Sequence, residues 1–187
     1  MRKITITIAV ALLIIGIGVG TYILFFQKDA VDKSGNDLQD AQNVEWRNVE
    51  FKDANTGETF KVSDFKGQNI LLESFAVWCP TCLSQQKEMK KLRDQGDDTV
   101  HISLDTDPNE DESIVKEHAL NNNLDWRFAV SPNEATKSLI KDFGINIVFA
   151  PGAPVLLICD DDAQSARFLP AGVKDADKLQ QEIDKGC

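Results

Sequence analysis

The chain is poor in basic residues, because 20 lysines and arginines stand against 30 aspartates and glutamates, which gives a net charge of −10. The sequence shows no lysine- or arginine-rich patch. Binding to nucleic acid, or tight binding to anionic lipid, needs clustered positive charge, so this composition argues against both. Internal repeats and low-complexity segments are also absent from the sequence, which favours an ordinary globular domain with an appendage.

Histidine is scarce as well, with two residues in the whole chain. His101 lies on one face of a predicted strand and His118 in the middle of a predicted helix, and neither has partners at the spacing of metal ligands. This pattern favours ordinary structural or exposed histidines and weakens a copper-chaperone interpretation. Residues 105–111 begin like a calcium-binding loop, but the glycine and the bidentate glutamate of such loops are missing. We expect a solvated acidic loop that caps the next helix.

Charge is lacking entirely in residues 4–26, which follow Arg2 and Lys3. As a helix this stretch would span about 34 Å, roughly the hydrocarbon core of a bilayer. A cleaved signal peptide is the alternative, but no small-residue cleavage site follows the stretch. We therefore expect a transmembrane anchor in residues 1–26, a flexible polar linker in 27–43 and a folded domain in 44–187. The positive residues before the span favour a cytoplasmic N-terminus and an extracytoplasmic domain.

Two of the four cysteines form the motif Cys79-Pro80-Thr81-Cys82, directly after an apolar run and Trp78. Pro80 suits the first position of a helix, which would put Cys79 at the helix N-terminus. There the free N–H groups and the helix dipole favour a thiolate. One helical turn brings the two thiols together, so the motif can alternate between dithiol and disulfide. A structural disulfide would close too short a loop to stabilise much, and a zinc site would need a second ligand pair.

The rest of the domain alternates short apolar runs with helical patterns. We expect a hairpin over residues 51–60, with its turn at 55–57. Further strands are expected at 70–77, 100–104, 126–130, 155–158 and 167–169, and helices at 79–95, 112–121, 134–143 and 175–185. Strands that alternate with helices predict parallel crossovers, and the last two strands predict an antiparallel hairpin across 160–165. The result is an α/β fold with a mixed sheet covered on both faces.

Trp78-Cys79-Pro80-Thr81-Cys82 after a buried strand, with Gly152-Ala153-Pro154 before another, resembles the thioredoxin fold. More narrowly, the chain is similar to the membrane-anchored TlpA/ResA/DsbE-like thioredoxins, and residues 62–67 before the buried strand are typical of them. The resemblance covers about residues 44–187. It implies a thioredoxin fold with an N-terminal β-hairpin extension, preceded by one transmembrane helix.

The resemblance also implies roles for individual residues. Cys79 would be the exposed nucleophile and Cys82 the buried resolving thiol. Pro154 would be a cis-proline that faces the disulfide, and Ala153 would offer backbone groups to an extended substrate. Trp78, Pro80 and Thr81 would complete the substrate-binding surface. Glu73 lies where thioredoxins often carry a buried acid, and we expect it to relay a proton to or from Cys82, although pairing with a lysine is the alternative.

The sequence departs from this family pattern at three places. Residues 147–151 look like an insertion before the Gly152-Ala153-Pro154 turn, which could change the substrate groove or serve as a docking loop. Phe75 stands where many relatives have tryptophan. Glu73 replaces what is often an asparagine in the reductive branch, which leaves the pathway assignment open.

The remaining cysteines, Cys159 and Cys187, lie apart from the motif. Cys159 follows Pro154 by about 16 Å of strand, at the pole of the sheet away from Cys79. The next strand runs back and the final helix returns, so Cys187 ends near Cys159. A structural disulfide is our hypothesis, since disulfides persist outside the cell, and two unpaired thiols are the alternative.

The sequence thus predicts a membrane-tethered, extracytoplasmic thiol–disulfide oxidoreductase that uses no organic cofactor and no metal. By resemblance it would reduce disulfides in other proteins, one candidate being an apocytochrome, with electrons from a membrane-embedded thiol reductase. The alternatives are a disulfide oxidase or isomerase for secreted proteins, and a non-enzymatic metallochaperone or tethered binding module.

Overall fold

The computed structural model describes residues 45–161 and 164–187. The predicted anchor and linker, residues 1–26 and 27–43, lie outside this range. Among the helices of the described residues, none is long and apolar enough to cross a membrane.

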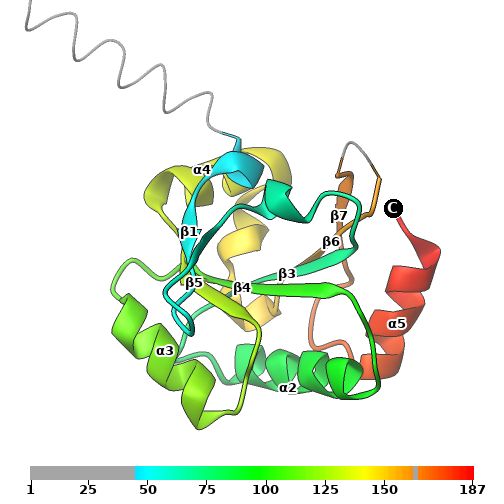
Figure 1. The fold of residues 1–187 in the computed structure, drawn as a ribbon, viewed down its shortest axis with the longest axis horizontal. Helices are drawn as coiled ribbons and strands as arrows, with labels where there is room; N and C mark the ends of the chain where they lie inside the picture. The colour runs from blue at the N-terminus through cyan, green and yellow to red at the C-terminus, as the bar shows by residue number, and fades with distance from the viewer. Residues whose placement is uncertain (1–44, 162–163) are drawn as a thin grey trace, which may run out of the picture. The chain divides into compact units, whose positions relative to one another are not determined.

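The centre of the domain is a five-stranded mixed sheet with the order β5-β4-β3-β6-β7 (Figure 1). Its strands are β3 (Ile70–Phe75), β4 (Val100–Asp105), β5 (Arg127–Val130), β6 (Val155–Ile158) and β7 (Ala166–Phe168). The first three are parallel to one another, β6 is antiparallel to β3, and β7 is antiparallel to β6. The predicted parallel crossovers and final hairpin are therefore confirmed.

The middle strand β3 is buried along its whole length, because side chains cover both faces of the sheet. Leu71 and Phe75 belong to a core that includes residues of α2 (Pro80–Asp94), α3 (Glu112–Asn121) and α5 (Ala176–Lys185). Ile70 and Leu72 face the other core, which includes residues of α4 (Asn133–Phe143). Since side chains alternate along a strand, Glu73 points to the same face as Leu71 and Phe75, toward α2.

Aspartate side chains at two helix N-termini accept hydrogen bonds from free backbone N–H groups. Asp111 accepts from the N–H groups of Ser113 and Ile114 at the start of α3, and Asp175 accepts from Lys178 N at the start of α5. The expected capping role of the acidic loop before α3 is confirmed. Asp105, however, is not solvated as predicted: it belongs to β4 and its side chain is fully buried.

An N-terminal layer precedes the sheet. It consists of a 3-10 turn η1 (Trp46–Asn48), the strands β1 (Phe51–Lys52) and β2 (Thr59–Phe60), and a 3-10 turn η2 (Val62–Phe65). The predicted hairpin is confirmed, with Phe51 opposite Phe60 and their rings stacked.

The inserted residues before the Gly-Ala-Pro turn form two further 3-10 turns, η3 (Ile145–Val148) and η4 (Ala150–Gly152). η4 packs against α2, and the chain then passes through Ala153 in a left-handed conformation (φ 46°) into Pro154 and β6. No cis peptide bond occurs in the described residues, so the Ala153–Pro154 bond is trans. The cis-proline prediction was wrong, because here the insertion and the left-handed Ala153 make the reversal that leads into β6.

Cys159 and Cys187 are joined by a disulfide with a Cα–Cα distance of 6.0 Å, which agrees with the pairing hypothesis.

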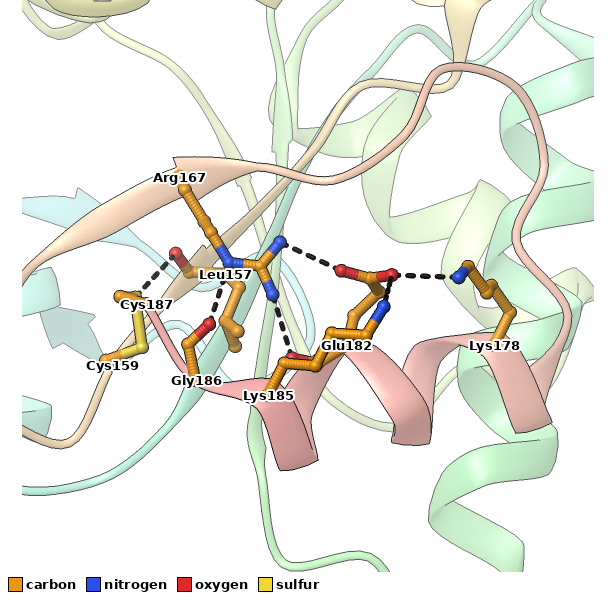
Figure 2. A network of polar contacts seen from close by, with 8 residues as sticks. All are labelled: Leu157, Cys159, Arg167, Lys178, Glu182, Lys185, Gly186 and Cys187. Atoms are coloured by element: carbon orange, nitrogen blue, oxygen red, sulfur yellow. Dashed lines mark hydrogen bonds and ion pairs between the residues drawn. A yellow bond between two sulfur atoms is a disulfide. The ribbon is translucent and has the colours of Figure 1, made fainter.

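Figure 2 shows how the last turn of α5 is held beside β7. Arg167 Nε donates to Gly186 O at 2.8 Å, and its two terminal nitrogens donate to Glu182, one to the side chain and one to the carbonyl. Lys178 and Lys185 also pair with Glu182. Three cations thus hold the pKa of the Glu182 carboxyl down to about 2.

Candidate active site

The CxxC motif lies at the N-terminus of α2, as predicted. Cys79 is the N-cap residue and Pro80 is the first helical residue. The Cys79 sulfur accepts a hydrogen bond from the Cys82 backbone N–H at 3.2 Å, so a helix donor already points at the first thiol. Both cysteines are free thiols, and the structure therefore shows the dithiol form of the motif.

Both thiols are buried, which differs from the expected exposure of Cys79. Cys79 is 1% exposed and Cys82 is 0% exposed. The insertion contributes to the burial of Cys82, because η4 packs against α2 and Cys82 Sγ donates to Ala150 O at 3.2 Å.

Burial is the main cause that raises the pKa of the Cys82 thiol. The hydrogen bond with Cys79 and the charge of Glu73 act in the same direction. Cys82 is therefore protonated at rest and needs a base before it can attack a mixed disulfide.

Glu73 is fully buried and is the nearest candidate for that base. Burial raises its pKa to about 8, although two hydrogen bonds oppose the shift. Gln86 Nε2 and Ser103 Oγ both donate to Glu73 Oε2, at 3.0 and 2.9 Å. Its other oxygen, Oε1, is buried without a hydrogen-bond partner among the described residues. A carboxyl group with a pKa near 8 can take up and release a proton at physiological pH.

Lys174, which the sequence did not single out, is the second buried charge at this site. It is 3% exposed, and its Nζ donates to Ala153 O at 2.7 Å. Burial lowers the pKa of Lys174 to about 8, and the charge of Glu73 partly offsets this shift. Glu73 and Lys174 therefore influence each other through their charges. The Lys174 ammonium group donates its hydrogen bond to the Ala153 carbonyl.

The contacts of Ala153 contradict its expected role in substrate binding. Its carbonyl accepts from Lys174, its N–H donates to Ala150 O at 2.8 Å, and the residue is 0% exposed. Pro154 is buried too, and its carbonyl accepts from Ser74 N at 3.2 Å. The backbone groups expected to bind a substrate are therefore engaged within the protein, by Ala150 of the inserted turns, by Lys174 and by Ser74.

Trp78 is 60% exposed, next to the motif, and a loop from β4 fixes its position. The indole Nε1 donates to Asp107 Oδ2 at 2.6 Å, and Val77 N donates to Glu110 Oε2 at 2.7 Å. Behind this loop, burial and the neighbouring Glu110 carboxyl raise the pKa of Asp105 to about 8. Of the other two motif residues, Pro80 is exposed and Thr81 half-buried.

A cleft of about 300 Å³ begins beside Trp78. Its walls come from the motif loop, the loop after β4 and the insertion: Ala76, Trp78, Thr106, Asp107, Pro108, Val148, Phe149, Ala150 and Pro151. Phe149 is 59% exposed and also lines a second cleft of about 470 Å³, together with Pro154. The exposed apolar surface next to the thiols thus comes from Trp78 and the insertion.

The described residues contain no group of three or more histidine, cysteine or acidic side chains placed to hold a metal ion. His118 is buried against Gln86, and His101 lies 3.5 Å from Asp97. The chemistry that this site offers is therefore that of two thiols, a buried carboxyl group and a buried amine.

Comparison with known proteins agrees with this geometry. The Redoxin family model matches residues 33–166. The thiol:disulfide interchange protein DsbE of Vibrio cholerae serotype O1 is 40% identical over 43 residues, which are 23% of this chain and 23% of that protein. The chain thus spans about a quarter of the length of this curated relative.

Solved structures show the same fold at low identity. The pneumococcal exposed lipoprotein thioredoxin Etrx1 of Streptococcus pneumoniae matches with a TM-score of 0.57 and 20% identity, over 73% of this chain and 98% of that one. StoA from Bacillus subtilis matches with a TM-score of 0.54 and 18% identity, over 71% and 93%.

The fold is that of thioredoxin, and the site carries the two-cysteine motif at a helix N-terminus on which thiol–disulfide exchange depends. The chain belongs to the Redoxin family.

Proposed function

We propose that this protein is a membrane-anchored, extracytoplasmic thiol–disulfide oxidoreductase that reduces disulfides in other proteins. The observation that carries the proposal is the dithiol at the N-terminus of α2, with the sulfur of Cys79 facing a helix N–H and a buried carboxyl group acting on Cys82. Cys79 attacks the substrate disulfide and forms a mixed disulfide. Cys82 then attacks Cys79, which releases the substrate thiol and leaves a Cys79–Cys82 disulfide.

Glu73 serves this second step as the base. Its carboxylate takes the proton of Cys82, so that the thiolate can attack, and the neutral acid later returns the proton. In the resting protein burial disfavours the charged forms of both groups, which keeps Cys82 from reacting before a mixed disulfide has formed.

The reducing direction is supported by the surroundings of Cys82. Strong oxidants of this type owe their high potential to stabilisation of the reduced form. Here burial raises the pKa of Cys82, so its thiolate is not stabilised. The Cys82 side of the pair thus lacks that stabilisation, which favours release of electrons by the dithiol.

The extracytoplasmic location is supported by the uncharged stretch of residues 4–26 and by the Cys159–Cys187 disulfide, because disulfides persist mainly outside reducing compartments. Electrons would come from a membrane-embedded thiol reductase. The resemblance to the TlpA/ResA/DsbE-like thioredoxins makes an apocytochrome the first substrate to test.

The Cys79–Cys82 reduction potential tests the direction. We expect a value near −270 mV, and a value near −120 mV would assign the protein to the disulfide oxidases instead. Stoichiometric metal binding by a pair that never forms a disulfide would favour the metallochaperone alternative. A Cys82→Ser variant stalls the mixed disulfide, so mass spectrometry of the trapped complexes identifies the substrate.

A further variant tests the substrate surface. Trp78 and Phe149 present exposed rings beside the thiols, and both line the first cleft. If a substrate segment binds there, Phe149→Ala raises KM for a protein disulfide and leaves the reaction with a small dithiol reagent unchanged. Ile145→Ala is the matched control, because Ile145 is similarly exposed but lines neither cleft.

A further inference from the structure

The two oxygens of the Glu73 carboxyl group have different surroundings. Oε2 accepts two hydrogen bonds, from Gln86 Nε2 and Ser103 Oγ. Oε1 is buried and has no partner among the described residues. Since a buried polar atom without a partner is costly, the asymmetry calls for a functional explanation.

Each of the two donors is oriented by a second buried side chain. Trp126 Nε1 donates to Ser103 Oγ at 3.0 Å. An indole N–H can only donate, so the Ser103 oxygen accepts there and directs its own hydrogen to Glu73.

The amide of Gln86 is oriented in the same way. Its NH₂ group faces Glu73, and its oxygen lies 2.7 Å from His118 Nε2. An amide oxygen only accepts, so the hydrogen of the His118 ring is on Nε2. The ring also stacks on Phe75, which fixes its plane.

We propose that the pairs Gln86–His118 and Ser103–Trp126 are positioning residues for the Glu73 proton: they keep Oε2 as a hydrogen-bond acceptor and leave Oε1 to exchange the proton with Cys82. The inference rests on the proposed role of Glu73 in the second step of exchange. The step itself balances, because the Cys82 S–H bond breaks, an O–H bond forms at Oε1, and the Cys82 thiolate then displaces Cys79 from the mixed disulfide.

Other ionisable groups around Glu73 have defined positions. The thiols of α2 lie on the same face of the sheet, with Cys82 sensing the charge of Glu73. Lys174, from the segment before α5, favours the charged form of Glu73. Burial lowers the pKa of His118, so this ring acts as a neutral donor. The two positioning pairs thus act by hydrogen bonding, separately from the charge of Lys174.

The direct test is the titration of the Glu73 side-chain carboxyl carbon, followed by NMR in the full chain in its dithiol form and assigned with Glu73→Gln. Removal of one donor, in Gln86→Leu or Ser103→Ala, should lower the ionised fraction of Glu73 at pH 7 by about tenfold. Ser103→Thr keeps the hydroxyl and should restore the titration. Gln85→Leu is the matched control: Gln85 is an equally buried neighbour on α2, but it bonds the backbone of Lys174 instead of Glu73.

Double variants test the orienting residues. Trp126→Phe keeps an aromatic ring and loses the N–H, so it should lower the ionised fraction less than Ser103→Ala and have no further effect in the Ser103→Ala background. His118→Phe should behave in the same way toward Gln86→Leu. If the titration is unchanged in Gln86→Leu and Ser103→Ala, or if Gln85→Leu shifts it as much, the inference is wrong.

Kinetics separate this inference from the proposed function. The rate at which Cys82 resolves a preformed mixed disulfide on Cys79 should follow the NMR titration as pH is varied, in the parent and in each variant. If the titration of Glu73 changes in a variant but the pH dependence of the resolving rate does not, the proposed role of Oε1 is wrong, even though the protein still exchanges disulfides. If the protein exchanges no disulfides but the titration shifts as described, the proposed function fails and the positioning pairs stand.

Discussion

The two cysteine pairs lie at opposite ends of the same sheet and differ in almost every respect. Cys79 and Cys82 follow the C-terminal end of β3, whereas Cys159 adjoins Ile158, the residue opposite Ile70 at the start of β3. The first pair consists of free thiols one helical turn apart, in contact with a helix N-terminus and near a buried carboxyl group. The second pair is a disulfide that closes a separation of 28 residues, beside the Arg167–Glu182 network.

The difference shows what makes a cysteine pair reactive in this protein. Close spacing gives the first pair little value as a cross-link, but under the proposed function the helix N–H and Glu73 control the protons of its two thiols during exchange. The second pair is already joined, and it links the segment after α5 to the segment after β6. Four predictions, from the largest expected effect to the smallest, test this division of roles.

Cys79→Ser should abolish disulfide exchange, because no other thiol can form the mixed disulfide. Insulin reduction with dithiothreitol as the electron source measures the rate. The double variant Cys159→Ala/Cys187→Ala should keep the rate within about twofold of the parent. Loss of activity in this double variant, in folded protein, would contradict the division between the two pairs.

The same double variant should be less stable by about 3.5 kcal/mol, the loop-closure value for a separation of this length. Denaturant unfolding of the oxidised parent and the variant gives the difference. Cys79→Ala/Cys82→Ala is the control, and its midpoint should shift much less, because a Cys79–Cys82 disulfide closes too short a loop to stabilise much. Equal shifts would show that the C-terminal disulfide has no special structural role.

The stability of the protein should fall as the pH rises from 4.5 to about 8, because the folded protein holds the Glu73 proton that the unfolded chain has released. The slope is about 1.4 kcal/mol per pH unit for one such group. Asp105, whose pKa burial also raises to about 8, adds a slope of the same sign. Lys174 acts above pH 8 with the opposite sign, since its pKa is lowered to about 8.

Glu73→Gln should remove its share of this slope, which denaturant unfolding between pH 5 and pH 8 measures. Asp105→Asn is the matched comparison, with a similar effect on the slope but less effect on the resolving step. A slope that survives Glu73→Gln unchanged would mean that Glu73 is charged in the folded protein.

Glu182→Gln should destabilise the protein by about 1–2 kcal/mol at neutral pH, because the buried carboxylate faces Arg167 and two lysines. The contribution exists above the ordinary pKa of 4.5 and should disappear as the pH falls through about 2. Lys178→Ala, which removes an exposed partner, should destabilise the protein much less, because solvent screens exposed ion pairs. Exchange activity should be unchanged in both variants. A loss of activity would show that the Glu182 network influences the CxxC motif at the other end of the sheet.

Much of the fold could be predicted from local patterns. The apolar run of β3, the proline after Cys79 and the hairpin residues each specify one conformation through short-range rules, and the structure has them within a few residues of the predicted bounds. The Cys159–Cys187 pairing followed from counting strand directions, since each strand reverses or keeps the direction in a fixed way.

The details of the site could not be predicted in this way. Cys82 lies against the insertion, which folds into η4 and packs on α2, and no local rule states where a 3-10 turn will pack. Lys174 enters the core from a segment 92 positions beyond Cys82 in the sequence, so its bond to Ala153 exists only in the tertiary structure. Its sole signal was its place in a short apolar and small-residue stretch before α5.

The burial of Lys174 makes this residue a chemical probe of local opening. Amine-directed reagents react with accessible amines, and an amine that is 3% exposed and bonded to Ala153 O is not accessible while the domain is closed. Once released to solvent it would be acylated as fast as a surface lysine. The acylation rate of Lys174, followed by peptide mass spectrometry, therefore reports how often the hydrogen bond between Lys174 and Ala153 O opens to solvent. Comparison with the rate at which Cys79 reacts shows whether one motion uncovers both.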